Sequence, residues 1–528
     1  MRRRLPLHWA GAVYVGALLL LSGCATVQSG HTVPRPVSIA LAHPEQTAFG
    51  ARVSSLAAPH PGASAFHILT AGVDGLLSRV QMIDEAQKSL DLQYFIFRGD
   101  QTGHLILAAL TRAAARGVAV RLLLDDGDTL DGDEQVLALR TQPGVDIRVF
   151  NPFRYRGHNR LIRALEFAAT LGRLDYRMHN KMLVADNSVA LIGGRNIGNE
   201  YFQVDPQAQS ADDDVFVAGP VVPTLSATFD EYWNSRFAVP VAALTRQSRE
   251  DVRAARHPHA PASIDGVDYS VRIASGDPLE SMLDGRIALV WATAQVLCDS
   301  PDKRSADAGA PGRIMVRDFL NAARQVQSEF LMINPYIVPT NGESRMLADL
   351  RHRDVKVGIV TNSLQSTRDI LAYAGYIHSR KPLLKEGIDL YEVRAQLGTT
   401  RGSGQTARVS RLGHYGLHGK LVVFDRQRIF IGSMNFDERS RHLNTESGLI
   451  IDSPELAAQT TARFNAMAQP DNAYRPAFIA GAAAAGGPLQ WTTQEHGATV
   501  IYQHEPSPNP WRRIITRILS WLPVRKEL

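Results

Sequence analysis

The sequence contains only two cysteines, Cys24 and Cys298, in 528 residues. This scarcity excludes a fold held together by several disulfides, and it excludes any disulfide at all if Cys24 serves another purpose. No recognisable motif surrounds Cys298, which we expect to be a small buried apolar residue and not a nucleophile. Clusters of carboxylates with metal-ligand spacing are also lacking. The sequence therefore gives no reason to expect a metal or any other cofactor.

Composition is otherwise that of an ordinary globular protein, with 45% hydrophobic and 21% charged residues. The length is too great for one ordinary domain and favours two large units or several small ones. A net charge of +5 fits an anionic partner such as a membrane surface or nucleic acid. It is equally compatible with no particular partner.

The most informative feature is a short pattern, H-x-K-x4-D-x6-G-[GS]-x-N, that occurs twice. The first copy runs from His179 to Asn196 and the second from His418 to Asn435. Five of the six defined positions are identical in the two copies, the sixth is Gly194 in one and Ser433 in the other, and the spacing is the same. One His-x-Lys is a weak signal in a long chain, whereas two matched copies are a strong one.

The regions before the two motifs also match each other. In each we expect the order helix, strand, helix, strand: first over residues 72–86, 89–97, 104–115 and 118–126, then over 314–326, 330–337, 344–353 and 355–362. This indicates an internal duplication of about 200 residues. The predicted fold class is α/β, with two halves related by a pseudo-two-fold axis and one motif from each half at the seam.

Two histidines from matched halves can divide the work of a phosphodiester displacement. One imidazole attacks phosphorus, while the other protonates the departing alkoxide and then deprotonates the incoming alcohol. Lys181 and Lys420 follow their histidines by two residues, so they share a strand face with them and can bind phosphate oxygens. Asn196 and Asn435 can donate amide hydrogen bonds to the same oxygens. The lysines supply positive charge, so the chemistry requires no metal.

Each histidine also needs an acid on its other ring nitrogen. Aligning the apolar runs that follow the motifs places Asp212 opposite Glu446, and we expect these two acids to orient the histidines. Alternatively, Asp212 is part of a solvated acidic turn. The motif aspartates Asp186 and Asp425 are catalytic candidates by position, although we expect them to tie their own loops and not to carry protons.

The paired signature resembles that of the phospholipase D superfamily. Further stretches are similar to bacterial cardiolipin synthases, closest to the C-type branch, from about residue 65 to the C-terminus; they include Asn151-Pro152-Phe153, Thr361-Asn362-Ser363-Leu364 and Ala374-Gly375-Tyr376. The resemblance implies a duplicated phospholipase D fold of two α/β/α sandwich halves. It also implies transfer of a phosphatidyl group to phosphatidylglycerol through a phosphohistidine, with phosphatidylglycerol or phosphatidylethanolamine as donor. By the same resemblance His179 is the nucleophile and His418 the acid/base.

Some alternatives remain open. If water and not a lipid alcohol resolves the phosphohistidine, the protein is a phosphodiesterase that hydrolyses phospholipid. Nucleic acid is a less expected substrate, because nuclease members of the superfamily are often shorter with one motif per chain. A lipoprotein with a decayed site is a third alternative. The duplication permits a working monomer. Gly194 stands where the family commonly has serine.

The first 24 residues read as a targeting segment. Arg2, Arg3 and Arg4 precede an apolar stretch that ends Leu21-Ser22-Gly23-Cys24, which resembles a bacterial lipobox. We therefore expect a bacterial lipoprotein anchored at Cys24, facing the periplasm, and the following Ala25 favours the outer membrane. A plain signal peptide or an N-terminal membrane helix is the alternative.

The remaining boundaries follow from composition. We expect a flexible tether over residues 25–62, the halves over 63–245 and 266–475, a linker over 246–265 and a C-terminal extension over 476–528. Residues 511–522 have apolar side chains on one side of a helix and arginines on the other. They predict an interfacial helix on anionic lipid; the alternative is a helix docked on the body with its arginines in solvent.

Overall fold

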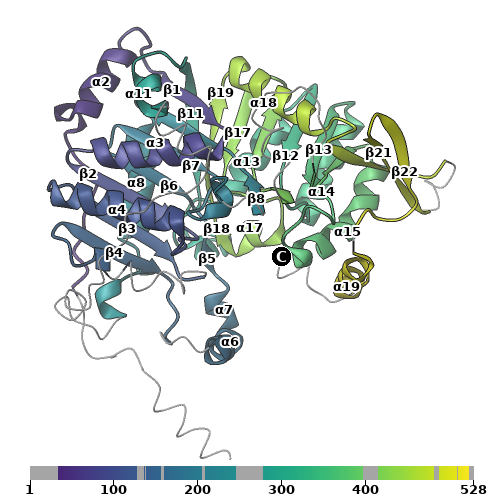
Figure 1. The fold of residues 1–528 in the computed structure, drawn as a ribbon, viewed down its shortest axis with the longest axis horizontal. Coiled ribbons are helices and arrows are strands. Elements are labelled where there is room, and N and C mark those ends of the chain that lie inside the picture. The colour runs from purple at the N-terminus through teal and green to yellow at the C-terminus, as the bar shows by residue number, and fades with distance from the viewer. Residues whose placement is uncertain are drawn as a thin grey trace, which may run out of the picture.

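The computed structural model describes residues 34–127, 136, 138–155, 160–204, 208–244, 277–396, 414–480, 487–507 and 509–521. The expected signal peptide with Cys24 and the expected linker over 246–265 lie outside these residues. Two α/β halves lie side by side, the first purple to teal and the second green to yellow (Figure 1). The predicted fold class, a duplicated α/β chain, is confirmed.

The first half is a mixed sheet between layers of helices. Its strands pair in the order β4 (Val145–Phe150), β3 (Ala119–Asp125), β2 (Ser89–Tyr94), β6 (Met182–Ala185), β7 (Val189–Gly193), β9 (Asp214–Ala218) and β1 (Ser64–Leu69). Strands β2, β3 and β4 run parallel, and the other neighbours are antiparallel. One face carries α3 (Gly72–Glu85) and α4 (Gln101–Ala115); the other carries α8 (Val222–Trp233).

The second half repeats this arrangement. Its strands pair in the order β14 (Asp389–Val393), β13 (Lys356–Asn362), β12 (Glu329–Ile333), β16 (Leu421–Phe424), β17 (Arg428–Gly432), β19 (Ser447–Asp452) and β11 (Val290–Cys298). Its helices are α13 (Met315–Arg324), α14 (Asn341–His352), α15 (Ile370–Lys385) and, on the opposite face, α18 (Pro454–Met467). The equivalent strands β1 and β11 pair antiparallel with each other, so the two sheets are continuous across the seam.

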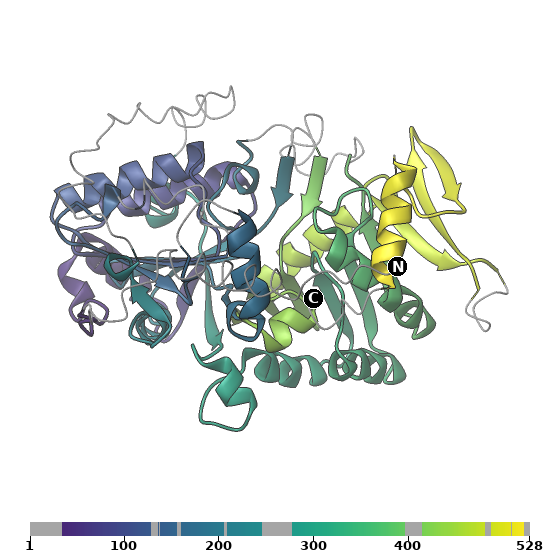
Figure 2. The same cartoon turned by 90° about the horizontal axis from the view of Figure 1, so that it is seen from below.

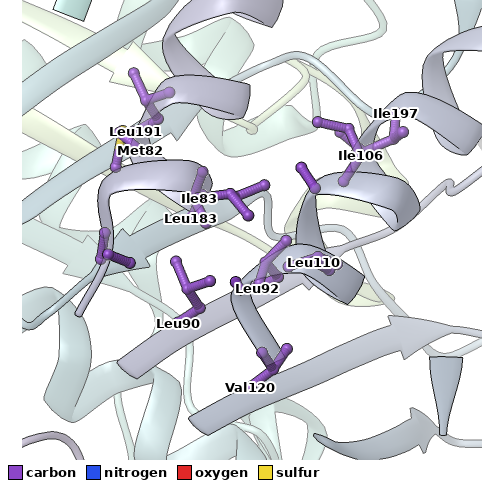
Figure 3. Close-up of a cluster of buried hydrophobic side chains, with 14 of the residues drawn as sticks. Met82, Ile83, Leu90, Leu92, Ile106, Leu110, Val120, Leu183, Leu191 and Ile197 are labelled. Carbon is purple, nitrogen blue, oxygen red and sulfur yellow. The ribbon is translucent and has the colours of Figure 1, made fainter. Parts of the chain in front are cut away.

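Three large apolar cores in the described part of the chain follow from the alternation of side chains along the strands. One lies between the first sheet and α3 and α4, and Figure 3 shows part of it, with Leu90, Leu92 and Val120 of the sheet facing Ile83, Ile106 and Leu110 of the helices. A second lies under α13 and α14. The third contains residues of α8 and of α18 and so belongs to both halves. A shared core of this kind fixes the relative position of the two motifs.

The N-terminal boundary corrects one prediction. Within the expected tether, η1 (Pro44–Gln46) and α2 (Ala48–Ala57) form regular structure, and α2 buries Phe49 and Val53. The Thr47 hydroxyl caps α2 by accepting a hydrogen bond from the Gly50 N–H. The described part of residues 25–62 therefore belongs to the folded first half, because its few apolar residues have the spacing of one helix face.

The boundary between the halves also shifts. Helix α11 (Pro278–Leu283), which we assigned to the second half, packs against α2 and α3 of the first. Its Leu279 and Met282 join the first core, and Glu280 forms an ion pair with Arg52 of α2. In the structure the second half therefore begins at β11.

The chain after α18 adds three antiparallel strands and a last helix to the second half, beginning at Ala473, three residues before the predicted start of the C-terminal extension. β20 (Ala473–Phe478) pairs with β14 and continues into β21 (Leu489–Glu495) and β22 (Ala498–Tyr502), and α19 (Pro510–Ser520) packs on α15. The shorter elements are α6 (Arg160–Ala169), α7 (Leu171–Leu174), η3 (Asn199–Tyr201), β10 (Ala238–Pro240), η4 (Val241–Ala243), α12 (Lys303–Asp307) and α17 (Glu438–His442). None of the helices in the described part of the chain has the length and apolar character needed to cross a bilayer.

Candidate active site

Two short parallel strand pairs connect the halves next to the motifs. β5 (Arg177–Met178) pairs with β18 (Asn444–Thr445), and β8 (Ala208–Ala211) pairs with β15 (His414–Leu417). Each pair contains one strand from each half. Each also joins the residues just before a motif histidine to the residues just before an acid of the other half. The backbone thereby brings both motifs to one place.

His179 is held by an acid of the second half. Its Nδ1 lies 2.9 Å from Glu446 Oε2, and its backbone N–H donates to the Thr445 carbonyl at 2.9 Å. The Glu446 carboxylate also accepts the hydroxyls of Ser433 at 2.5 Å and Ser440 at 2.7 Å. Every residue of this group is buried, so the imidazole is fixed with Nδ1 toward the acid and Nε2 on the other side of the ring.

His418 is held in the mirrored way by an acid of the first half. Its Nδ1 lies 2.5 Å from Asp212 Oδ2, and its backbone N–H donates to the Ala211 carbonyl at 2.7 Å. The other Asp212 oxygen accepts the N–H of Asp213 at 2.8 Å, and Lys420 Nζ lies 3.2 Å from the same histidine nitrogen. The two histidine–acid pairs therefore cross between the halves, which the sequence did not reveal.

Strand register shows that the two acids occupy equivalent positions. Gly193 pairs with Asp214 and Gly432 with Gly448, so Asp212 and Glu446 each precede the paired residue by two. The difference at Gly194 now has a physical reason. A Cβ at Gly194 would lie 2.1 Å from Asp212 Oδ1, so the shorter acid needs glycine there, whereas serine at the matching position of the second half donates to Glu446.

The lysines lie beside their own histidines, as the period of two predicted. Lys181 Nζ donates to the His179 carbonyl at 2.5 Å, and Lys420 Nζ donates to the His418 carbonyl. Both side chains are buried. An ammonium has three protons, so each lysine retains donors for a further anion.

Burial dominates the protonation of these four groups. It lowers the pKa of His179 well below its usual value, with Lys181 and Lys420 acting in the same direction. Burial and Lys420 lower the pKa of His418 to about 3, although Asp212 opposes the shift. Burial also lowers the pKa of Lys181 well below its usual value and that of Lys420 to about 8. In the absence of a bound anion, burial therefore favours the neutral form of both imidazoles, and the negative charge of a bound phosphodiester favours a proton on His418.

Asn196 and Asn435 lie close to the site, and each has an unpaired amide atom. Asn196 Oδ1 accepts the Ile96 N–H at 3.2 Å, while its buried Nδ2 has no hydrogen-bond partner among the described residues. Asn435 likewise has its buried Oδ1 without a partner there; amide oxygen and nitrogen are assigned and not observed. An aromatic ring lies next to each histidine: Phe95 is edge-on to His179, and Tyr201 is edge-on to His418.

The motif aspartates Asp186 and Asp425 lie at the far ends of their strands. The Asp186 carboxylate accepts the backbone N–H groups of residues 87–89, and Asp425 accepts those of residues 327–329. Strand β6 or β16 separates each from its histidine, a span of roughly 13 Å at 3.3 Å per residue. We therefore assign them a structural role, joining two strands, in place of a catalytic one.

A buried strand that ends in polar residues precedes each motif, and the two strand ends have equivalent roles. Asp125, at the end of β3, accepts the backbone N–H of Met178 at 2.8 Å. Asn362, at the end of β13, accepts that of Leu417 at 2.9 Å. Each therefore positions the residue just before a histidine. The signal was present in the sequence, because both buried strands end in polar residues, but it did not reveal the partner.

A buried ion pair between Asp299 and Lys303 holds the backbone of Glu446 in place. Asp299 Oδ2 accepts the Glu446 backbone N–H at 2.9 Å and lies 2.8 Å from Lys303 Nζ. Lys303 also donates to the carbonyls of Ser440 and Asn444. This pair has no motif of its own, so the sequence did not reveal it. Among the described residues no group of three or more His, Cys, Asp or Glu has the arrangement of a metal site.

Comparison with known proteins gives consistent matches. The family model described as "Cardiolipin synthase, PLD-like domain" matches residues 80–233 and 316–468. Cardiolipin synthase C of Escherichia coli (strain K12) is 33% identical over 89% of this chain and 98% of that protein. A cardiolipin synthase of Clostridium perfringens (strain SM101) is 24% identical over 72% of this chain and 66% of its own length. The crystal structure of phosphatidylserine synthase from Haemophilus influenzae Rd KW20 shares the fold, with a TM-score of 0.53 and 14% identity over 90% of this chain and all of that one.

Proposed function

The chain belongs to the family of cardiolipin synthases with phospholipase D-like domains, and we propose that it transfers a phosphatidyl group to phosphatidylglycerol to form cardiolipin. The phosphatidyl donor is a second phosphatidylglycerol or phosphatidylethanolamine. The observation that carries this proposal is the crossed arrangement of the histidines. Each imidazole is aligned by a buried acid of the opposite half, so both halves contribute to one site and a single chain can catalyse both steps.

The reaction is a double displacement at phosphorus. Nε2 of His179 attacks the donor phosphodiester, the bond from phosphorus to the headgroup oxygen breaks, and His418 gives that oxygen a proton. A hydroxyl of phosphatidylglycerol then loses its proton to His418 and attacks the phosphohistidine. The phosphorus–nitrogen bond breaks, which restores neutral His179 and protonated His418. The product is cardiolipin, and the other product is the headgroup alcohol.

Differences between the two acids support this assignment of roles. Burial alone would raise the pKa of Asp212, but His418 and Lys420 lower it below its usual range, so it keeps a full charge beside His418. Burial raises the pKa of Glu446, and two hydroxyls share its charge. Asp212 therefore stabilises an imidazolium more strongly than Glu446 does. His418 is better suited to hold a proton, and His179 to remain a neutral nucleophile.

An assay of lipid products tests the proposal. Purified protein with labelled phosphatidylglycerol, with and without phosphatidylethanolamine, is expected to yield cardiolipin. Because Lys181 and Lys420 supply the positive charge at phosphate, EDTA should leave the rate within about twofold. Phosphatidic acid as the main product would instead identify a hydrolase. Activity that disappears in EDTA and returns only with a divalent ion would contradict the metal-independent mechanism.

The pH dependence tests the role of Lys420. Its pKa is lowered to about 8 by burial, so it is charged below pH 8 and loses its charge above. We expect KM for the phosphodiester to rise by about tenfold per pH unit above 8, since the protonated fraction falls at that rate. Lys420→Arg keeps its charge and should abolish this rise even if kcat falls. A KM of the unaltered protein that stays constant to pH 10 would contradict the role.

We also propose that the chain is a lipoprotein of the bacterial envelope, anchored at Cys24 and facing the periplasm, in the outer membrane. The lipobox-like sequence before Cys24 supports this, and two or three acyl chains hold a protein stably on a bilayer. Labelled palmitate fed to cells should appear in the protein and be absent from the Cys24→Ala variant. Equal labelling of the unaltered protein and the variant, or no labelling of either protein, would contradict the proposed anchor at Cys24.

A further inference from the structure

Helix α19 attaches to the body by its polar side. Thr516 is fully buried and Ser520 is buried, while the Ser520 carbonyl oxygen lies 2.7 Å from His378 Nε2. Arg512 donates to the carbonyl of Thr367. The apolar side faces outward, with Trp511 68% and Trp521 77% exposed and Ile514, Ile515 and Ile518 about half exposed. This is the reverse of a surface helix that packs on an apolar core.

Helix α6 in the first half has the same reversed orientation. Arg163 is 7% exposed and donates to the Asp126 carbonyl at 2.5 Å, and its guanidinium lies over the Phe153 ring. Glu166 accepts the backbone N–H groups of Arg154 and Tyr155 at 2.7 and 2.9 Å. Its exposed side chains are the apolar ones, with Leu161 68% and Leu165 58% exposed. Two helices from different halves thus present apolar faces outward.

The two helices lie on one side of the molecule. In Figure 1 α6 and α19 are both at the lower side, and Figure 2, seen from below, shows both in front of the sheets. α6 is also close to the site along the chain, because α7 and then β5 lead from it directly to His179. A surface that meets α6 and α19 together would therefore contact both halves of the molecule.

Lipid is the surface that fits these faces. Large apolar side chains gathered on a helix face are unfavourable in water and mark an interaction site. Tryptophans at both ends of α19 are typical of helices that lie in the interface of a bilayer. Arg513 and Arg517 flank the apolar face of α19, and cations in that place attract anionic headgroups.

We propose that α6 and α19 are paired lipid-contacting helices, one from each half, which insert their apolar faces into an anionic bilayer and turn the site toward it. The choice of phosphatidylglycerol as the anionic lipid rests on the proposed function. The contact itself does not depend on activity. Phospholipid substrates would then reach His179 and His418 from the membrane without crossing water.

Single-cysteine labelling tests the contact directly. The full chain with Cys24→Ser retains only Cys298, which is buried and whose thiol pKa is raised by burial to about 12, so it does not react. An environment-sensitive fluorophore is placed at Leu165→Cys on α6, at Ile518→Cys on α19 and at Ile501→Cys, an exposed control on β22. Vesicles of phosphatidylglycerol and phosphatidylethanolamine contain brominated lipid as quencher.

Quenching at positions 165 and 518 should exceed that at 501 by severalfold, and neutral phosphatidylcholine vesicles should quench less. A label at 165 that is quenched no more than the one at 501 would overturn the role of α6. A concentration-dependent dimer without quenching would also overturn the proposal, because the apolar faces would then meet a second copy of the chain.

A charge-introducing variant relates the contact to turnover. Leu161→Glu with Leu165→Glu should lower turnover of vesicle substrate by about tenfold and leave turnover of a short-chain, monomeric phosphodiester unchanged. Equal loss on both substrates would overturn the docking role, since it would show damage to the site. Quenching with no turnover on either substrate would support the contact while contradicting the proposed function.

Discussion

Replacing either His179 or His418 with alanine is expected to lower cardiolipin formation by about 10⁴-fold. Without His179 no covalent intermediate can form. Without His418 neither the departing nor the incoming alcohol has a proton carrier. The two groups act as one unit, so the double variant should be no less active than the worse single variant. Initial rates with labelled phosphatidylglycerol measure the effect.

An exposed histidine provides the control for these variants. His352 lies on α14, where it forms an ion pair with Glu386 away from the site, so His352→Ala should keep full activity. Thermal unfolding should show that all variants remain folded. A His179 or His418 variant that retained the normal rate would refute the mechanism.

The crossed acids are expected to have the second-largest effect. Glu446→Gln should lower kcat by about 10²–10³-fold, because the amide loses the charge and can donate a proton to Nδ1 of His179, which selects the wrong tautomer. Asp212→Asn should act in the same way through His418. In a His179→Ala protein, Glu446→Gln should cause no further loss of kcat. In a His352→Ala protein, it should still lower kcat.

Glu343 is a matched control for these substitutions. It is a buried carboxylate of the second half, but it caps the first turn of α14 and touches neither histidine. Glutamine can replace glutamate in such a cap, so Glu343→Gln should retain activity. If Glu446→Gln also retained activity, the acid would be a packing residue and the crossed arrangement would have no catalytic meaning.

The doubled motif made much of the site predictable. It identified the histidines, the lysines and the asparagines, and it led to the acids by alignment of the strands that follow. The pairing of each acid with the opposite histidine was not predictable. It depends on β5–β18 and β8–β15, strand pairs of two to four residues that join positions more than 200 apart. Such short strands leave no periodic signal.

Element boundaries depended on caps that periodicity does not show. α4 begins at Gln101, three residues before the predicted start, because Asp100 accepts the Gly103 N–H. α14 begins at Asn341 for the same reason, with Thr340 as its cap. The amphipathic pattern of residues 511–522 predicted an apolar face, of which residues 511–521 are described. The pattern did not show that the helix packs on the body of the protein through its polar face.

Trapping the covalent intermediate tests the central claim, a phosphohistidine formed in one site built from both halves. The unaltered protein is mixed with phosphatidylglycerol labelled in its phosphate, quenched rapidly with denaturant, digested and mapped by mass spectrometry. We predict an acid-labile phosphatidyl adduct on His179, in the peptide that contains Lys181, with less of it in Glu446→Gln protein and none in His179→Ala protein. An adduct on any other residue, or rapid turnover with no adduct on His179, would contradict the account.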